Sequence, residues 1–371
     1  MKVKTIILFW IIGVLAIAVS LSLYSVSRKQ STPYTAVTSV NKNAAEAEKE
    51  NESKIAKTLI IPKEKTLKNI NHVFQTFNNC GPASLSMALS FYGINKSQTE
   101  LGQQLRPYQN PQGDNDDKSV TLEELAKEAN KYGFATFHRP AGNIEMIKKF
   151  VAYDMPVITR TWLKPNDDIG HYRVVKGYDE DKGILIQDDS LQGKDLEYSH
   201  GDFNEIWKMF NYEYLVLVPN DKVEIAKGIL QKDVNEDEAW KKAVKLARQQ
   251  LEQNENDTYA RFNLSVALYN IKEYEAAIKE FEQVETLISK RTLWYQIEPI
   301  LAYYEIQDYE RVFTLTNEIL NNNNRAFSEL YIVRGNIYRN EGKISEAKSE
   351  YEKALNYNVN LEAAKQAINS L

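Results

Sequence analysis

The sequence is poor in the residues that build metal and disulfide sites. Its 371 residues include one cysteine and four histidines. A single cysteine excludes a disulfide within the chain and any zinc or redox site built on a Cys-x-x-Cys pair. The histidines show no His-x-x-x-His spacing, and the chain has no Gly-Lys-Ser or Gly-Lys-Thr phosphate-binding loop. We therefore expect neither a metal nor another cofactor.

Positive charge is also sparse relative to negative charge. The chain has 46 Lys and Arg against 51 Asp and Glu, a formal net charge of −5, and no basic stripe. Nucleic acid is therefore not an expected partner. A chain of this length is typical of two or three domains with a substantial core.

The amino terminus contains the one long apolar run of the sequence. No charged residue occurs between Lys4 and Arg28. A helix over the 20 residues 5–24 would rise about 30 Å, enough to cross the hydrocarbon core of a bilayer. A signal peptide usually has a shorter apolar core of roughly 7–15 residues. We interpret residues 1–30 as an uncleaved single-pass membrane anchor, with a cleaved signal peptide as the alternative.

The flanks of this run give a first prediction of orientation. Basic residues stand on both sides of it, and short basic amino-terminal tails usually stay in the cytoplasm. This predicts a cell-membrane protein whose bulk is extracytoplasmic. Residues 31–70 are rich in Asn, Lys, Glu, Ser and Ala, with no aromatic between Tyr34 and Phe74. Such a composition predicts a flexible linker.

The carboxy-terminal part, residues 221–371, repeats a helical pattern. Large residues recur at spacings of 34, 35 and 35, and small ones follow each by three positions: Trp240, Tyr274, Tyr309 and Ile344, then Ala243, Ala277, Val312 and Ala347. This period resembles tetratricopeptide repeats, helix hairpins that bury their apolar faces by stacking on neighbours. A generic helical bundle is the alternative reading.

Two features set individual repeats apart. The third unit has Pro299 and Thr316 where the motif has leucine and a large aromatic residue, and the first unit's leading helix, near 222–232, is short. Repeats of this kind predict a protein partner, or docking within the chain, rather than a reaction. Three residues are candidates for the concave face: Asn263, Tyr295 and Arg334.

The only cysteine stands at the start of a predicted helix. After Cys80, apolar residues recur at helical spacing as far as Tyr92, and Gly93 ends the pattern. Pro82 suits the first turn, where its missing N–H costs nothing. The dipole and free N–H groups at a helix amino terminus favour a thiolate, so Cys80 is a candidate nucleophile.

A candidate base follows in a predicted hairpin. His171 opens a strand over 172–178, and Asp188 and Asp189 close a second strand over 183–187. The two ends of a hairpin lie side by side, so a carboxylate there can orient His171, and His171 can accept the Cys80 proton. Strand register decides which aspartate faces the histidine. The other histidines, His72, His138 and His200, are read as structural.

A glutamine precedes the cysteine by five positions. The Gln75 side-chain amide could donate to a developing oxyanion together with the Cys80 backbone N–H. A solvent-exposed polar residue is the equally weighted alternative.

Together these motifs resemble the papain-fold cysteine peptidases of the bacteriocin-processing (double-glycine leader) peptidase-like family. The resemblance rests on Cys-Gly-Pro-Ala at 80–83, Gly-His-Tyr at 170–172, Gly-Tyr-Asp at 177–179 and a strand that ends in aspartate. It implies an α+β papain-like domain over residues 71–220. It also implies four roles: Cys80 as nucleophile, His171 as general base, Asp188 as orienting residue and Gln75 as oxyanion donor.

The sequence departs from the family pattern at two points. Four residues separate Gln75 from Cys80 where five are usual, and Asp189 stands where proline often follows the aspartate. The peptide exporters of the family also carry an ATPase, for which this chain has no phosphate-binding loop.

These features predict a membrane-anchored, extracytoplasmic cysteine peptidase that acts on a peptide or protein substrate and binds a protein partner through its repeats. Two alternatives stay open. One is a binding scaffold that holds peptides without cleaving them. The other is an amidase or transpeptidase acting on cell-wall peptides, since the same residues serve that chemistry.

The orientation can be checked in cells. We expect alkaline phosphatase fused after residue 70 to be active, because the enzyme folds productively only outside the cytoplasm. A fusion that is made in normal amount but stays inactive would contradict the predicted orientation.

Overall fold

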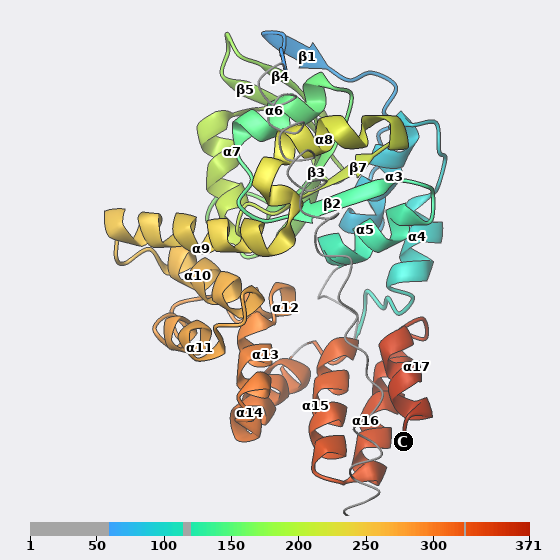
Figure 1. Cartoon of the computed structure of the whole chain (residues 1–371). Helices are drawn as coiled ribbons and strands as arrows, with labels where there is room; N and C mark the ends of the chain where they lie inside the picture. Colours follow the sequence, from blue (N-terminus) through green and yellow to red (C-terminus); the bar gives the residue numbers. More distant parts are fainter. Residues whose placement is uncertain (1–58, 114–119, 323) are drawn as a thin grey trace, which may run out of the picture. The chain divides into compact units, whose positions relative to one another are not determined.

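The computed structural model describes residues 59–113, 120–322 and 324–371 (Figure 1). The predicted membrane anchor, residues 1–30, lies outside these ranges, as does most of the predicted linker. Within the described ranges, no helix is long and apolar enough to cross a membrane.

The first part of the fold is built on one sheet. Six strands follow the order β2-β7-β3-β4-β5-β6, and β1 pairs with β4 away from this path. All the pairings are antiparallel. The strands are β1 (Glu64–Thr66), β2 (Ala135–Arg139), β3 (Val157–Trp162), β4 (Gly170–Asp179), β5 (Ile184–Asp189), β6 (Gly193–Ser199) and β7 (Tyr214–Val218).

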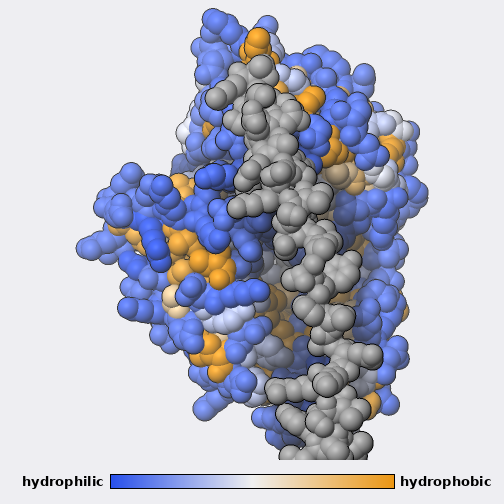
Figure 2. Space-filling view, viewed as in Figure 1, coloured by the Kyte–Doolittle hydropathy of each residue, from blue (hydrophilic) through white to orange (hydrophobic). Residues whose placement is uncertain are grey.

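Helices cover both faces of this sheet. On one face, α3 and α5 pack against strand residues such as Ile158, Tyr172 and Leu215. On the other face, α6, α7 and α8 pack against alternate residues such as Val157 and Val216. The helices are α3 (Cys80–Phe91), α4 (Gln98–Leu105), α5 (Leu122–Asn130), α6 (Ile144–Ala152), α7 (His200–Trp207) and α8 (Val223–Leu230). This layered arrangement confirms the predicted α+β domain. The face of the molecule in Figure 2 is mostly hydrophilic, with apolar side chains in separate patches.

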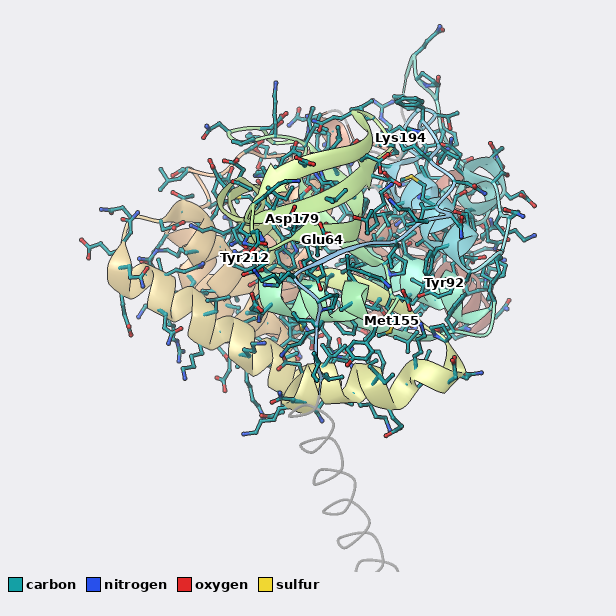
Figure 3. All side chains as sticks on the ribbon, turned by 90° about the horizontal axis from the view of Figure 1, so that it is seen from above. Glu64, Tyr92, Met155, Asp179, Lys194 and Tyr212 are labelled. Carbon is teal, nitrogen blue, oxygen red and sulfur yellow. The ribbon has the colours of Figure 1, made fainter. Side chains whose placement is uncertain are left out.

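The predicted linker is wrong at its carboxy-terminal end. Residues Glu64–Thr66 form β1 and pair with β4, and Leu67 is buried in the core. Figure 3 labels Glu64 and Asp179, which are partners in this pairing. The sequence did not predict this strand because it lacks the alternation of apolar and polar residues typical of strands. Backbone pairing with β4 and the buried Leu67 side chain hold the strand in place.

The second part of the fold is all helical. The helices pair as hairpins, with α10 against α11, α13 against α14 and α15 against α16. They are α9 (Glu236–Gln253), α10 (Thr258–Asn270), α11 (Tyr274–Glu282), α12 (Thr292–Tyr295), α13 (Glu298–Glu305), α14 (Tyr309–Asn321), α15 (Ser328–Asn340), α16 (Ile344–Tyr357) and α17 (Glu362–Asn369). Tyr274, Tyr309 and Ile344 each begin the second helix of a hairpin, so the spacing found in the sequence is the spacing of the hairpins. Pro299 fits the hairpin of α13 and α14 because it lies in the first turn of α13.

The leading helix of the first repeat is a further correction. This helix, α8, packs on the core of the sheet domain through Ala226, Ile229 and Leu230. Helix α8 is therefore part of the sheet domain and does not form a repeat hairpin with α9. The sequence predicted a short leading helix here, but it did not show which core this helix would join.

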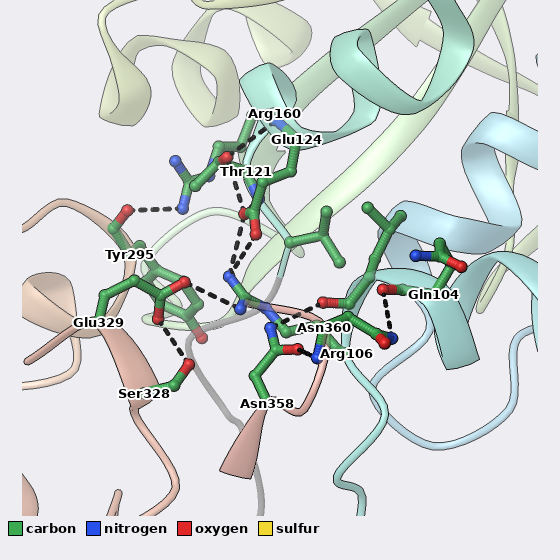
Figure 4. Close-up of polar contacts among 12 residues, drawn as sticks. Gln104, Arg106, Thr121, Glu124, Arg160, Tyr295, Ser328, Glu329, Asn358 and Asn360 are labelled. Atoms are coloured by element: carbon green, nitrogen blue, oxygen red, sulfur yellow. Dashed lines mark hydrogen bonds and ion pairs between the residues drawn. The ribbon is translucent and has the colours of Figure 1, made fainter. Parts of the chain in front are cut away.

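Polar contacts join the end of the array to the sheet domain (Figure 4). The Arg106 guanidinium, with a side chain only 1% exposed, pairs with Glu124 at 2.8 Å and with Glu329 of α15 at 2.9 Å. Asn358 and Asn360 donate to backbone carbonyls at the end of α4, those of Gln103, Gln104 and Leu105. Arg106 is buried and pairs with one carboxylate from each part of the fold. Removing Glu124 or Glu329 would leave the arginine charge buried with fewer partners, so this contact indicates a specific interface between the two parts.

The close approach within the last hairpin yields a stability prediction. A Cβ added at Gly335 would lie 2.4 Å from the Tyr351 ring. We expect Gly335→Ala to lower the free energy of unfolding by about 1–3 kcal/mol, because the helices must separate to admit a methyl group. Urea unfolding followed by circular dichroism measures this. Arg339→Ala, at an exposed position of the same helix, should change it by less than about 0.5 kcal/mol; equal stability of the two variants would contradict the packing.

Candidate active site

Cys80 is the first residue of α3. Its side chain is 6% exposed and faces a pocket of about 220 Å³. The first helical hydrogen bond runs from the Ala83 N–H to the Asn79 carbonyl, so the Cys80 and Gly81 N–H groups precede the regular ladder and Pro82 has none to satisfy. The helix amino terminus therefore places partial positive charge beside the sulfur, which favours the thiolate.

His171 lies beside the cysteine at the start of β4. Its imidazole makes hydrogen bonds with both Cys80 and Asp189. The bond to Asp189 joins Nε2 to Oδ1 at 2.9 Å, which leaves Nδ1 for the sulfur. The histidine is almost fully buried. A thiol, an imidazole and a carboxylate thus form one connected chain of hydrogen bonds, the arrangement of a nucleophile, a base and an orienting group.

The structure corrects the choice between the two aspartates. In the pairing of β4 with β5, Arg173 stands opposite Asp189 and Val174 opposite Asp188. Side chains alternate across a strand, so Asp189 shares the face of Arg173 and His171, while Asp188 points to the other face. There the Asp188 carboxylate pairs with Lys176 at 2.6 Å. Asp189, not the predicted Asp188, contacts the histidine.

Several groups hold the Asp189 carboxylate in its charged form. Oδ1 accepts hydrogen bonds from the backbone N–H groups of Leu191 and Gln192, at 2.7 and 2.8 Å, as well as from His171. Arg173 Nε lies 3.1 Å from Oδ2. Burial raises the pKa of Asp189, but His171, Arg173 and the Gln192 N–H outweigh burial and lower it to about 2. The carboxylate is therefore charged throughout the neutral range.

The charged carboxylate acts in turn on the histidine. Burial lowers the pKa of His171, but its hydrogen bonds with Asp189 and Cys80 and their negative charges outweigh burial, so the pKa lies above the ordinary value of 6.5. A raised imidazole pKa next to a cysteine favours transfer of the thiol proton to the ring. An imidazolium formed in this way would stabilise the neighbouring thiolate.

Gln75 lies in the wall of the same pocket as Cys80 and His171. Its backbone N–H donates to the Ser190 carbonyl at 2.7 Å, and Ser190 Oγ donates to its Oε1 at 2.8 Å. Because Ser190 engages the oxygen, the amide NH₂ is the donor that Gln75 can offer. Gln75 and Cys80 thus line one pocket despite the altered spacing between them. Gln75 is held there by Ser190, the residue that follows Asp189.

The opposite wall of the pocket comes from the repeat array. Arg291, Trp294 and Tyr295 line it, from α12 and the residue before it. A Cβ on Gly170 would lie 3.0 Å from the Tyr295 ring, so a larger residue beside His171 would require this ring to shift. Burial raises the pKa of Tyr295 to about 12, and the nearby Cys80 charge also raises it. The phenol therefore stays neutral at the edge of the site.

The predicted concave-face residues have different surroundings from those expected. Tyr295 faces the pocket, and Asn263 bonds with Asn211 and with the Lys208 carbonyl of the sheet domain. Arg334 pairs within the array, with Glu350 at 3.2 Å. Arg291 and Trp294 were missed by sequence reasoning. Their only signal in the sequence is their place between two repeat hairpins.

Comparison with known proteins identifies the sheet domain. Residues 67–215 match the model of the Peptidase_C39 like family. Residues 258–290 and 328–358 match the tetratricopeptide repeat. The chain carries a C39-like peptidase domain followed by tetratricopeptide repeats. No curated protein matches it.

Several solved structures resemble part of the chain. A C39-like peptidase from Bacillus anthracis is 19% identical, with a TM-score of 0.37, over 42% of this chain and 98% of that one. The peptidase domain of Streptococcus ComA, a bi-functional ABC transporter involved in quorum sensing, is 25% identical, with a TM-score of 0.32, over 40% of this chain and 97% of that one. MamA is 17% identical, with a TM-score of 0.33, over 38% of this chain and 80% of that one.

The corrected aspartate gives a prediction for the C39-like domain. Asp189→Asn should lower the pKa of His171 and remove the support for the thiolate. The rate of Cys80 alkylation by iodoacetamide at pH 6 should fall roughly tenfold, which corresponds to about one pKa unit, and should recover as the pH rises. The chain has one cysteine, so the alkylation rate reports Cys80 alone.

Asp188→Asn is the matched control for this experiment. It makes the same chemical change one residue away on the other face of β5, and it should leave the rate at pH 6 within about twofold if the imidazole is unaffected. Unfolding midpoints of both variants show whether each is folded. Equal alkylation rates for the two folded variants would contradict the assignment of Asp189.

Proposed function

We propose that this protein is a cysteine peptidase that hydrolyses amide bonds in peptides through Cys80, His171 and Asp189. The observation that carries the proposal is the hydrogen-bonded chain from the Cys80 sulfur through His171 to a carboxylate with a pKa near 2. The match of residues 67–215 to the Peptidase_C39 like family supports the choice of a peptide substrate.

The proposed reaction is an acyl transfer in two steps. The Cys80 thiolate attacks the substrate carbonyl carbon, and the Gln75 amide with the Cys80 N–H stabilises the oxyanion. The carbon–nitrogen bond then breaks, and the His171 imidazolium gives its proton to the leaving amine. A thioester on Cys80 remains. His171 next takes a proton from water, the hydroxide attacks the thioester, and a carboxylic acid and free Cys80 are released.

Asp189 is a positioning residue in this scheme. It fixes the ring of His171 through Nε2 and stabilises the imidazolium without accepting the proton, which its low pKa forbids. The same constellation could cleave cell-wall peptides, and the substrate test below includes them.

A binding scaffold without turnover is the second candidate. Residues of α12 line the pocket, and Cys80 is only 6% exposed. Limited access of a substrate to the sulfur favours the scaffold. The complete set of nucleophile, base and orienting group argues for catalysis, because a scaffold gains nothing from a raised imidazole pKa.

We further propose, from the sequence alone, that the peptidase is anchored in the cell membrane and faces away from the cytoplasm. The apolar run at residues 5–24 and its short basic amino-terminal flank support this.

Turnover can be tested with a mixed peptide library and with purified cell-wall peptides, using mass spectrometry to detect products. We expect cleavage of the library, none with Cys80→Ala, and a loss of about a thousandfold or more with His171→Ala. Gln75→Ala should lower kcat by about a hundredfold with a smaller change in KM, because an oxyanion donor acts in the transition state.

The outcomes separate the candidates. Products from cell-wall peptides but not from the library would favour the amidase alternative. Binding of library peptides with no turnover of either substrate would contradict the peptidase and favour the scaffold.

A further inference from the structure

The segment between α11 and α13 is fixed to the loop that precedes His171. Ser289 Oγ donates to one oxygen of Asp168 at 2.6 Å, and Arg291 Nη1 contacts the other at 3.1 Å. Behind them, Arg160 Nη2 of β3 donates to the Tyr295 carbonyl at 2.8 Å. Backbone and side chains of the array are thus tied to both strands that flank the site.

A second pocket, of about 230 Å³, lies on the array side of this segment. Its floor is apolar, formed by Ile288, Leu293, Leu315 and Ile319. Trp294 lines both this pocket and the one that holds Cys80. The two hollows are therefore neighbours that share one aromatic wall, one built on the peptidase and the other within the repeats.

Two cationic side chains around these pockets already form ion pairs with carboxylates of the protein, so the pockets do not favour a charged ligand. Lys290, on the rim of the apolar pocket, is paired with Glu318 on the same rim. Arg291, in the wall of the Cys80 pocket, is paired with Asp168. In addition, Ile169 and Leu191 in that wall are 40% and 51% exposed. The surface from Cys80 to the apolar pocket thus favours an uncharged chain with apolar side chains.

We propose that the apolar pocket is a substrate subsite of the peptidase, which holds a leucine-, isoleucine-, methionine- or phenylalanine-type side chain of the peptide whose cleaved bond lies at Cys80. This inference rests on the proposed peptide substrate. The apolar pocket is assigned to that substrate because Trp294 lines both this pocket and the Cys80 pocket. The repeats would then select the substrate directly, because they supply both the wall beside the nucleophile and the anchor pocket.

The chain offers a matched pair of variants for the test. Thr286 lines the apolar pocket and is exposed, so Thr286→Phe places a ring in the pocket without removing any core residue. Leu287, its neighbour, is 66% exposed and does not line the pocket, so Leu287→Phe is the control.

The experiment uses the full chain with Cys80→Ala, so that binding is measured whether or not turnover occurs. A random dodecamer peptide array is the probe. We expect bound peptides to share an apolar residue at one position, and Thr286→Phe to weaken their binding about tenfold or more, since burial of one such side chain is lost. Leu287→Phe should bind as the parent does.

Three results with the Cys80→Ala protein would overturn the subsite. These are equal binding by the Thr286→Phe and Leu287→Phe variants, no binding of any array peptide, and a change in oligomeric state by light scattering with Thr286→Phe, which would assign the pocket to a second copy of the chain. Cleavage of the library by the Cys80 protein with no apolar preference would leave the peptidase intact and reject the subsite alone.

Discussion

The register between β4 and β5 determines which carboxylate reaches His171, and the chemistry of the site depends on that contact. Pairing Arg173 with Asp189 puts these two residues and His171 on one face of the sheet. A shift of one residue would turn Asp188 toward the histidine and move Asp189 away. The register is itself held by charge, since Asp189 meets Arg173 on one face and Asp188 meets Lys176 on the other. Each buried carboxylate thus has its own cation, and a slip would separate both pairs.

From this contact the site extends into the second half of the chain. The imidazole stays beside Cys80 only if the start of β4 stays in place. That start is Gly170, against which the Tyr295 ring packs. The array is tied to the same loop through Asp168 and to β3 through Arg160. At the far end, Arg106 joins α15 to the sheet domain. The repeats therefore form part of the wall of the Cys80 pocket. Their proposed role thus changes from recruiting a distant partner to shaping the candidate active site.

The sequence was sufficient for features carried by local chemistry. The helix after Cys80 followed from Gly-Pro and the apolar spacing, and the hairpin that begins at His171 followed from two strands around a polar turn. The repeat hairpins followed from the 35-residue spacing of Tyr274, Tyr309 and Ile344. It was not sufficient for features set by pairing over long distances. The contact between His171 and Asp189 depends on the register of β4 and β5. Strand β1 depends on its pairing with β4, and the position of α8 depends on its packing against the core of the sheet domain. The wall formed by Trp294 and Tyr295 depended on how the array meets the sheet, which no local pattern reports.

The claim at the centre of this account is that Cys80 and His171 form a thiolate–imidazolium pair supported by Asp189. Nuclear magnetic resonance of the histidine side chains tests it most directly, because the chain has four histidines and His171→Gln identifies the signal that belongs to the site. We predict that the His171 ring has a pKa above 6.5 and that Cys80→Ala lowers this pKa, since the partner charge is lost. A ring that titrates at or below its ordinary pKa, unchanged by Cys80→Ala, would contradict the account.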